Sequence, residues 1–161
     1  MNDTKYKALK NLRFFVETIS LLGVVALIVT FAVTAEAAQT PISADASGLV
    51  GRLGIRRVLF LLFIIGGAVT GALFIVSRFP RLHKYPVEIN AGNVEVQYHI
   101  LKLALCAAQL VTIFATCFLM ISVVNRSIAL YSAEFAGVIV TSAILYAVIL
   151  LAYLLAARRF R

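Results

Sequence analysis

Four long apolar runs alternate with short polar segments along this chain. They cover about 14–34, 58–77, 100–124 and 135–157. A helix of about 20 apolar residues crosses a hydrocarbon core of about 30 Å and satisfies its own backbone hydrogen bonds there. The pattern therefore predicts an all-α membrane protein, a single domain over residues 1–161 that forms a bundle of four antiparallel transmembrane helices.

The basic residues gather in alternate gaps between these runs, which predicts the orientation of the chain. Eleven of the 15 Lys and Arg lie in the N-terminal tail, in or beside the 78–99 loop, and at the C-terminus, whereas four lie in or beside the 35–57 and 125–134 loops. Cytoplasmic loops are enriched in Lys and Arg. We therefore expect both termini and the 78–99 loop to be cytoplasmic, and the other two loops to be outside. The cluster Arg52, Arg56 and Arg57 runs against this count.

Composition excludes a soluble domain and disfavours nucleic acid as a partner. Hydrophobic residues make up 62% of the chain and charged residues 14%, against about 25% charged residues in typical soluble domains. The net charge is +8, but the basic residues lie at the ends of the spans. The expected partner of that charge is the anionic surface of a lipid bilayer.

The first apolar run has a competing interpretation as a cleaved secretory signal, because Ala35-Glu36-Ala37 resembles a cleavage site. The apolar part of such a signal covers about 7–15 residues. This run is longer and contains Glu17, so an uncleaved first span is the expected outcome.

The 78–99 loop is the most distinctive polar stretch. Pro80 and Pro86 forbid a helix through its first half. Asn90 is suited to cap a new helix, with its side-chain oxygen accepting a hydrogen bond from an amide of the first turn. We expect that helix to continue into the third span, with Asn93 and Gln97 on one face in the membrane interface.

A resemblance to a known family rests on this loop. Tyr85-Pro86-Val87-Glu88-Ile89, followed by Asn93, Glu95 and Gln97-Tyr98, resembles a family of bacterial integral membrane proteins of unknown function that is related to SdpI-type immunity proteins. The similar block covers about 78–105, and its motif positions are Pro86, Glu88, Asn90, Asn93, Gln97 and Tyr98. The Pro-x-His and Gly-x-x-Asp signature that the family carries between its first two spans is absent here. The resemblance implies a multi-pass protein of the bacterial cytoplasmic membrane with an immunity or accessory role.

Glu17 is the one acidic residue inside a predicted span, which makes it a candidate for ion or proton handling. It lies four residues after Arg13, near the expected cytoplasmic interface. An i, i+4 ion pair with Arg13 is the preferred interpretation.

Two further groups of residues inside the spans are candidates for packing or binding. Gly67 and Gly71 form a small-x-x-x-small pair, which lets a second helix approach closely. Packing within the same bundle is the preferred interpretation, and a homo-oligomer or a partner subunit is the alternative. Gln109, Thr112 and Thr116 share a face of the third span, where such side chains usually bond to neighbouring helices.

Catalytic and metal-binding patterns do not emerge from the sequence. Cys106 and Cys117 lie about 16 Å apart along one helix, too far for a bridge within the chain. His83 and His99 lack the spacing of metal ligands.

No cofactor is expected, and the favoured function is a non-enzymatic membrane protein that packs with itself or with a membrane partner. A small transporter or channel subunit is the alternative, and a membrane enzyme is a distant third.

Overall fold

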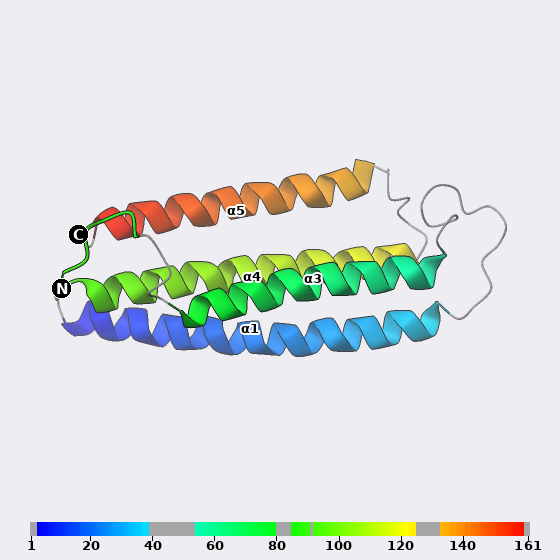
Figure 1. The fold of residues 1–161 in the computed structure, drawn as a ribbon, viewed down its shortest axis with the longest axis horizontal. Helices are drawn as coiled ribbons and strands as arrows, with labels where there is room; N and C mark the ends of the chain where they lie inside the picture. The colour runs from blue at the N-terminus through cyan, green and yellow to red at the C-terminus, as the bar shows by residue number, and fades with distance from the viewer. Residues whose placement is uncertain (1–2, 39–53, 80–84, 91, 125–132, 160–161) are drawn as a thin grey trace.

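The computed structural model describes residues 3–38, 54–79, 85–90, 92–124 and 133–159. Its four helices are α1 (Asp3–Ala37), α3 (Ile55–Arg78), α4 (Val94–Val124) and α5 (Ala133–Arg159). They run alternately in opposite directions along one elongated bundle, and both chain ends lie at the same end of it (Figure 1). We call this the termini end and the opposite one the far end. The predicted all-α fold with four antiparallel helices is confirmed.

All four helices are long and apolar enough to cross a membrane. They are also longer than the apolar runs. The 35 residues of α1 correspond to about 52 Å, so this helix extends well beyond a core of about 30 Å. The predicted loops shorten accordingly: α1 continues to Ala37, α3 begins at Ile55 and α4 begins at Val94. The loop residues 39–53, 80–84, 91 and 125–132 lie outside the described residues.

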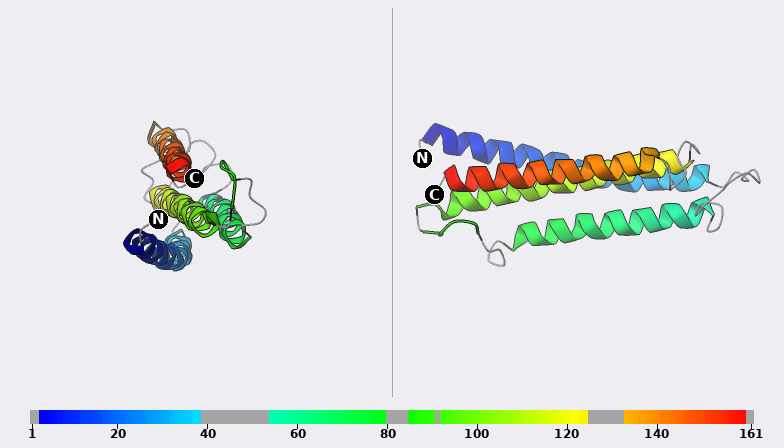
Figure 2. Two further views of the ribbon diagram at one scale, coloured as in Figure 1. Left: turned by 90° about the vertical axis from the view of Figure 1, so that its left-hand side faces the viewer. Right: turned by 90° about the horizontal axis from the view of Figure 1, so that it is seen from above.

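Helix α4 is the central element of the bundle. It packs against each of the other three helices, whereas α1 and α3 share a smaller contact. Seen from the end, α4 lies between α5 on one side and α1 and α3 on the other (Figure 2). Most of the large side chains on α5 are exposed, which suits a helix whose outer surface faces lipid.

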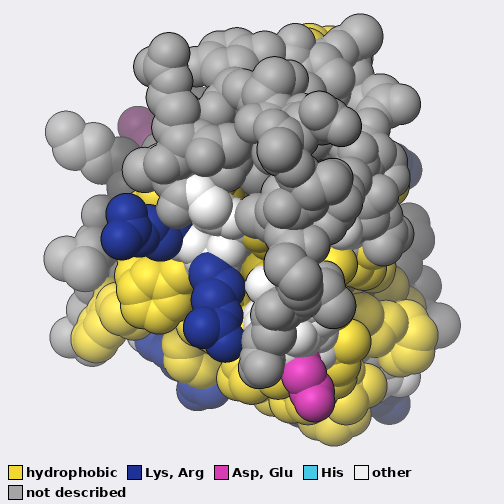
Figure 3. Space-filling model, turned by 90° about the vertical axis from the view of Figure 1, so that its right-hand side faces the viewer, with side chains coloured by type: hydrophobic (Ala, Val, Ile, Leu, Met, Phe, Trp, Pro, Cys, Tyr) yellow, Lys and Arg dark blue, Asp and Glu magenta, His cyan; other side chains and the backbone are white. Residues whose placement is uncertain are grey.

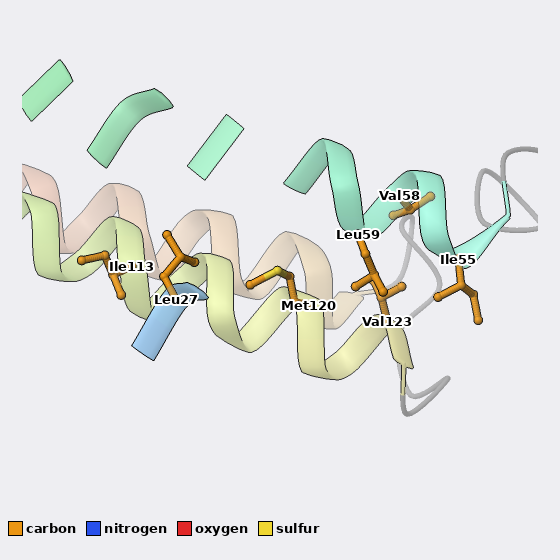
Figure 4. Close-up of a cluster of buried hydrophobic side chains, with 7 residues drawn as sticks. All are labelled: Leu27, Ile55, Val58, Leu59, Ile113, Met120 and Val123. Atoms are coloured by element: carbon orange, nitrogen blue, oxygen red, sulfur yellow. The ribbon is translucent and has the colours of Figure 1, made fainter. Parts of the chain in front are cut away.

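The hydrophobic core forms where α1, α3 and α4 meet, from the middle of the bundle toward the far end (Figure 4). Its seven buried members are Leu27, Ile55, Val58, Leu59, Ile113, Met120 and Val123. Phe31 of α1 stacks on Phe63 of α3 beside this cluster, with ring centroids 4.2 Å apart. The first helix therefore supplies part of the core.

Two glycines allow the helices to approach this closely. A Cβ on Gly23 of α1 would lie 3.1 Å from Ile113 Cδ1 of α4. A Cβ on Gly66 of α3 would overlap the side chain of Thr116 on α4, with Cγ2 only 2.5 Å away. Small residues at such crossings let helix backbones come together in a membrane.

Candidate functional site

Glu17 lies in a network of charges that joins α1 to α4 near the termini end. Arg13 Nε lies 3.3 Å from Glu17 Oε1, so the predicted i, i+4 pair is present. Lys102 Nζ of α4 lies closer still, 2.6 Å from the same oxygen. Arg13 Nη1 also donates a hydrogen bond to His99 Nδ1 of α4, at 2.7 Å. The two cross-helix contacts could not be predicted from the sequence, because they join residues more than 80 positions apart.

A small polar cleft of about 40 Å³ opens beside this network, between α1, α3 and α4. Arg78, Lys102 and Glu17 are its charged lining residues. The other lining residues are Ser20, Leu21, Phe74, Ser77, Cys106 and Gln109. The cleft thus carries two cations and one acid, and the acid is already paired with Arg13 and Lys102.

An apolar groove of about 330 Å³ adjoins the cleft and continues between α1 and α3 toward the middle of the bundle. The cleft and the groove share Leu21, Phe74 and Gln109 as lining residues. The groove is otherwise lined by Val24, Leu27, Ile28, Phe63, Gly67, Thr70 and Gly71. Together they form one continuous depression with a basic end and an apolar body.

Two buried hydroxyls in this depression have no hydrogen-bond partner among the described residues. Ser20 Oγ belongs to the cleft and Thr70 Oγ1 to the groove, and the two residues are 3% and 4% exposed. Hydroxyls of Ser and Thr in membrane helices commonly bond the carbonyl one turn back, as Thr34 does with Thr30 here. Both oxygens are enclosed by protein, so they are buried polar atoms and not exposed donors.

The predicted packing of Gly67 and Gly71 within the bundle is wrong. A Cβ at either position would have no atom within 4 Å, because both glycines line the open groove. Their neighbour Gly66 makes the close contact instead, against Thr116. Successive residues on a helix lie 100° apart, so a shift of one residue changes which surface a glycine faces.

Gln109, Thr112 and Thr116 are all buried, but they serve different neighbours. Gln109 lines the cleft and the groove on the α1–α3 side. Thr112 Oγ1 shares a hydrogen bond of 2.5 Å with Tyr146 Oη of α5. Thr116 donates to the Thr112 carbonyl at 2.8 Å and packs on Gly66. Thr112 therefore bonds to a neighbouring helix, as expected for polar side chains in spans, whereas Thr116 bonds within α4 and meets α3 by packing alone.

The predicted cap at the start of α4 is present. Asn90 Oδ1 accepts hydrogen bonds from the amides of Gly92 and Asn93, both at 3.0 Å. Asn93 Oδ1 accepts in return from the Asn90 amide at 2.9 Å, which is the reciprocal arrangement of a capping box. Asn93 Nδ2 also donates to the Glu88 carbonyl, at 3.0 Å. This network fixes the entry of the chain into α4.

The remaining motif residues divide into buried and exposed ones. Gln97 is fully buried and donates from Nε2 to the Ala157 carbonyl near the end of α5, at 2.9 Å. Asn93 is buried as well, so the shared face of Asn93 and Gln97 lies against protein and not in an open interface. Tyr98 is half-buried, whereas Pro86 and Glu88 are exposed in non-helical chain. Burial, followed by the nearby Tyr98 phenol, raises the pKa of Tyr85.

A second pocket, of about 500 Å³, lies at the far end between the end of α1 and the start of α3. Arg56 and Arg57 line it together with Phe31, Ala35, Phe60 and Leu61. Basic side chains stand beside hydrophobic ones when this end of the molecule is viewed directly (Figure 3). These are two of the arginines that run against the predicted orientation.

The described residues contain no group of three His, Cys, Asp or Glu side chains placed to hold a metal ion. Cys106 and Cys117 are free thiols. His83 lies outside the described residues.

No protein-family model, curated protein or solved structure matches this chain. The resemblance to SdpI-related proteins therefore stays a prediction from the sequence.

Proposed function

We propose that this chain is a non-enzymatic membrane protein that acts by holding a membrane partner against its helices, and that the α1–α3 groove receives that partner. The open glycine pair carries this proposal. Gly67 and Gly71 lie one turn apart on α3, line the groove, and have no neighbour within 4 Å of a Cβ. Small residues so spaced let another molecule reach the helix backbone. The bundle itself leaves this surface unused.

Two of the three polar side chains that share a face of α4 support lateral binding over transport. Thr112 and Thr116 are engaged with α5 and α3, so they contribute to packing within the bundle. An immunity or accessory role in a bacterial cytoplasmic membrane, as the resemblance implies, fits lateral binding because it requires contact with another membrane component and no catalysis. A second copy of the chain, a helix of another protein and a lipid are the possible occupants of the groove.

The test is the mass of the intact assembly after extraction of the tagged protein in mild detergent. Wild type is expected to carry a bound component, and Gly67→Leu and Gly71→Leu are expected to lose it because leucine fills the groove. Gly137→Leu is the matched control, since Gly137 of α5 is exposed and also has no neighbour within 4 Å. If the groove variants retain the same component as wild type, the proposal is wrong.

A further inference from the structure

We propose that the polar cleft and the apolar groove together bind one anionic phospholipid, with its phosphate between Arg78 and Lys102 and one acyl chain over Gly67 and Gly71. This inference rests on the proposed function, because it names the molecule that the groove receives. The two depressions share three lining residues, so a single amphiphile can occupy both.

The size of the groove selects a hydrocarbon chain over a helix. Its lining on α3 extends from Phe63 to Phe74, eleven residues or about 16 Å of helix. A volume of about 330 Å³ over that length corresponds to a mean cross-sectional area of about 20 Å², which matches the cross-sectional area of one acyl chain. A helix is about 10 Å across, so it is too wide to enter a groove of this section and would rest on its rims, whereas an acyl chain fits inside.

The charge of the cleft selects an anionic head group. Arg78 and Lys102 are its cations, and Glu17, its one acid, is paired with Arg13 as well as Lys102. An excess of positive charge therefore remains. The Arg78 guanidinium lies over the Phe74 ring, 5.1 Å from its centroid, and Phe74 lines both the cleft and the groove. Guanidinium groups match phosphate oxygens with two parallel hydrogen bonds.

The position of the cleft along the bundle suits a lipid head group. Arg78 is in the last turn of α3, a helix of 24 residues or about 36 Å that is just long enough to cross the hydrocarbon core. The groove starts at this level and extends toward the middle of the bundle, as an acyl chain does below its phosphate. Basic pockets between transmembrane helices are known to hold anionic head groups.

The test uses the full-length chain in detergent, mixed with dioleoyl phosphatidylglycerol or dioleoyl phosphatidylcholine, and counts bound lipids by native mass spectrometry. Both lipids contain a phosphate and the same chains, so the comparison varies only the head group, which is anionic in the first and zwitterionic in the second. Wild type is expected to retain one phosphatidylglycerol and to prefer it about fivefold or more, as one additional cation near a head group predicts. Equal retention of the two lipids overturns the inference.

Arg78→Gln is the decisive variant, because Arg78 is exposed and none of the ion pairs described depends on it. It should lose most of the preference for phosphatidylglycerol, whereas Arg159→Gln, at the same end but on α5, should keep it. Glu17→Gln leaves the cations in place and should bind phosphatidylglycerol at least as well as wild type. Unchanged preference in Arg78→Gln, or weaker binding in Glu17→Gln, overturns the inference.

The glycine variants separate this inference from the proposed function. If Gly71→Leu releases a bound protein and Arg78→Gln changes no lipid preference, the groove receives a helix, and only the lipid assignment fails. If Gly71→Leu changes neither bound protein nor bound lipid, both proposals fail. Free glycerol phosphate is the competitor that distinguishes a lipid head group from a free phosphate. If it displaces the lipid only at a large excess, the result supports a site that binds the whole lipid. If it displaces the lipid at equal concentration, the proposed acyl-chain contact is overturned.

Discussion

The contact between Gly66 and Thr116 gives the sharpest prediction about how this bundle is held together. A Cβ at position 66 would lie 2.5 Å from Thr116 Cγ2 and 2.9 Å from its Cβ, distances that real Cβ atoms essentially never show. Thr116 has little freedom to yield, because it is β-branched, buried and bonded through Oγ1 to the Thr112 carbonyl. Gly66→Ala must therefore push α3 away from α4.

The expected cost is that of overpacking a core, about 1–3 kcal/mol. For a chain of this size each kcal/mol lowers the Tm by about 2–4 °C, so Gly66→Ala should lower it by about 2–12 °C. Thermal unfolding in detergent can be followed with a thiol-reactive dye, since Cys106 and Cys117 are free and lie on α4.

The neighbouring glycine is the control for this experiment. Gly67→Ala adds the same methyl group one residue away, where nothing lies within 4 Å, and alanine also favours the helix. Its Tm should be equal to or above that of wild type. Thr116→Ala should recover most of the loss in the Gly66→Ala background. If Gly67→Ala lowers the Tm as much as Gly66→Ala does, the assignment of the helix faces is wrong.

Two further predictions concern the polar contacts of α4. Asn90→Ala should lower the Tm by about 2–4 °C, because a lost N-cap costs about 1 kcal/mol. Asn90→Asp should retain most of the stability. Equal Tm values for wild type and Asn90→Ala would exclude the cap. Gln97→Leu removes the hydrogen bond to the Ala157 carbonyl and should loosen the end of α5. Protease cleavage near Arg158 and Arg159 should then become faster. Gln109→Leu is the control, because Gln109 is buried on the same helix but faces α1 and α3, so this variant should leave the cleavage rate unchanged.

The fold could be predicted from the sequence because the bilayer restricts it so strongly. An apolar run of about 20 residues has few alternatives to a transmembrane helix, and Asn90 caps α4 through local contacts that the sequence contains. The extra turns at the start of α4 follow from that predicted cap, whereas those of α1 do not, because polar residues continue a helix beyond the apolar run without leaving a hydrophobic signal.

The site could be predicted only in part, because it depends on how far each helix is rotated about its axis. Glu17 was identified as the residue to explain, and its Arg13 partner followed from i, i+4 spacing. Lys102 was counted only as a basic residue near a loop, since pairing between helices leaves no periodic trace. Gly66 and Gly67 differ by 100° in direction around the helix axis, and this difference decides which of them packs against α4. In a helix that is apolar on every face, the sequence does not indicate which direction faces the neighbouring helix.

Tyr146 and Ala157 bear on how α5 acquires a defined position. Tyr146 shares a hydrogen bond with Thr112, and the Ala157 carbonyl accepts one from Gln97. Tyr146 and Ala157 are eleven residues, or about 16 Å, apart along α5. An apolar helix that meets its neighbour through dispersion contacts alone can slide and spin at little cost, since lipid offers similar contacts. Two directional bonds at separate heights remove both freedoms at once. The depth of α5 and its rotation are thus determined by two polar side chains of α4, so losing one bond should leave a helix that pivots about the other.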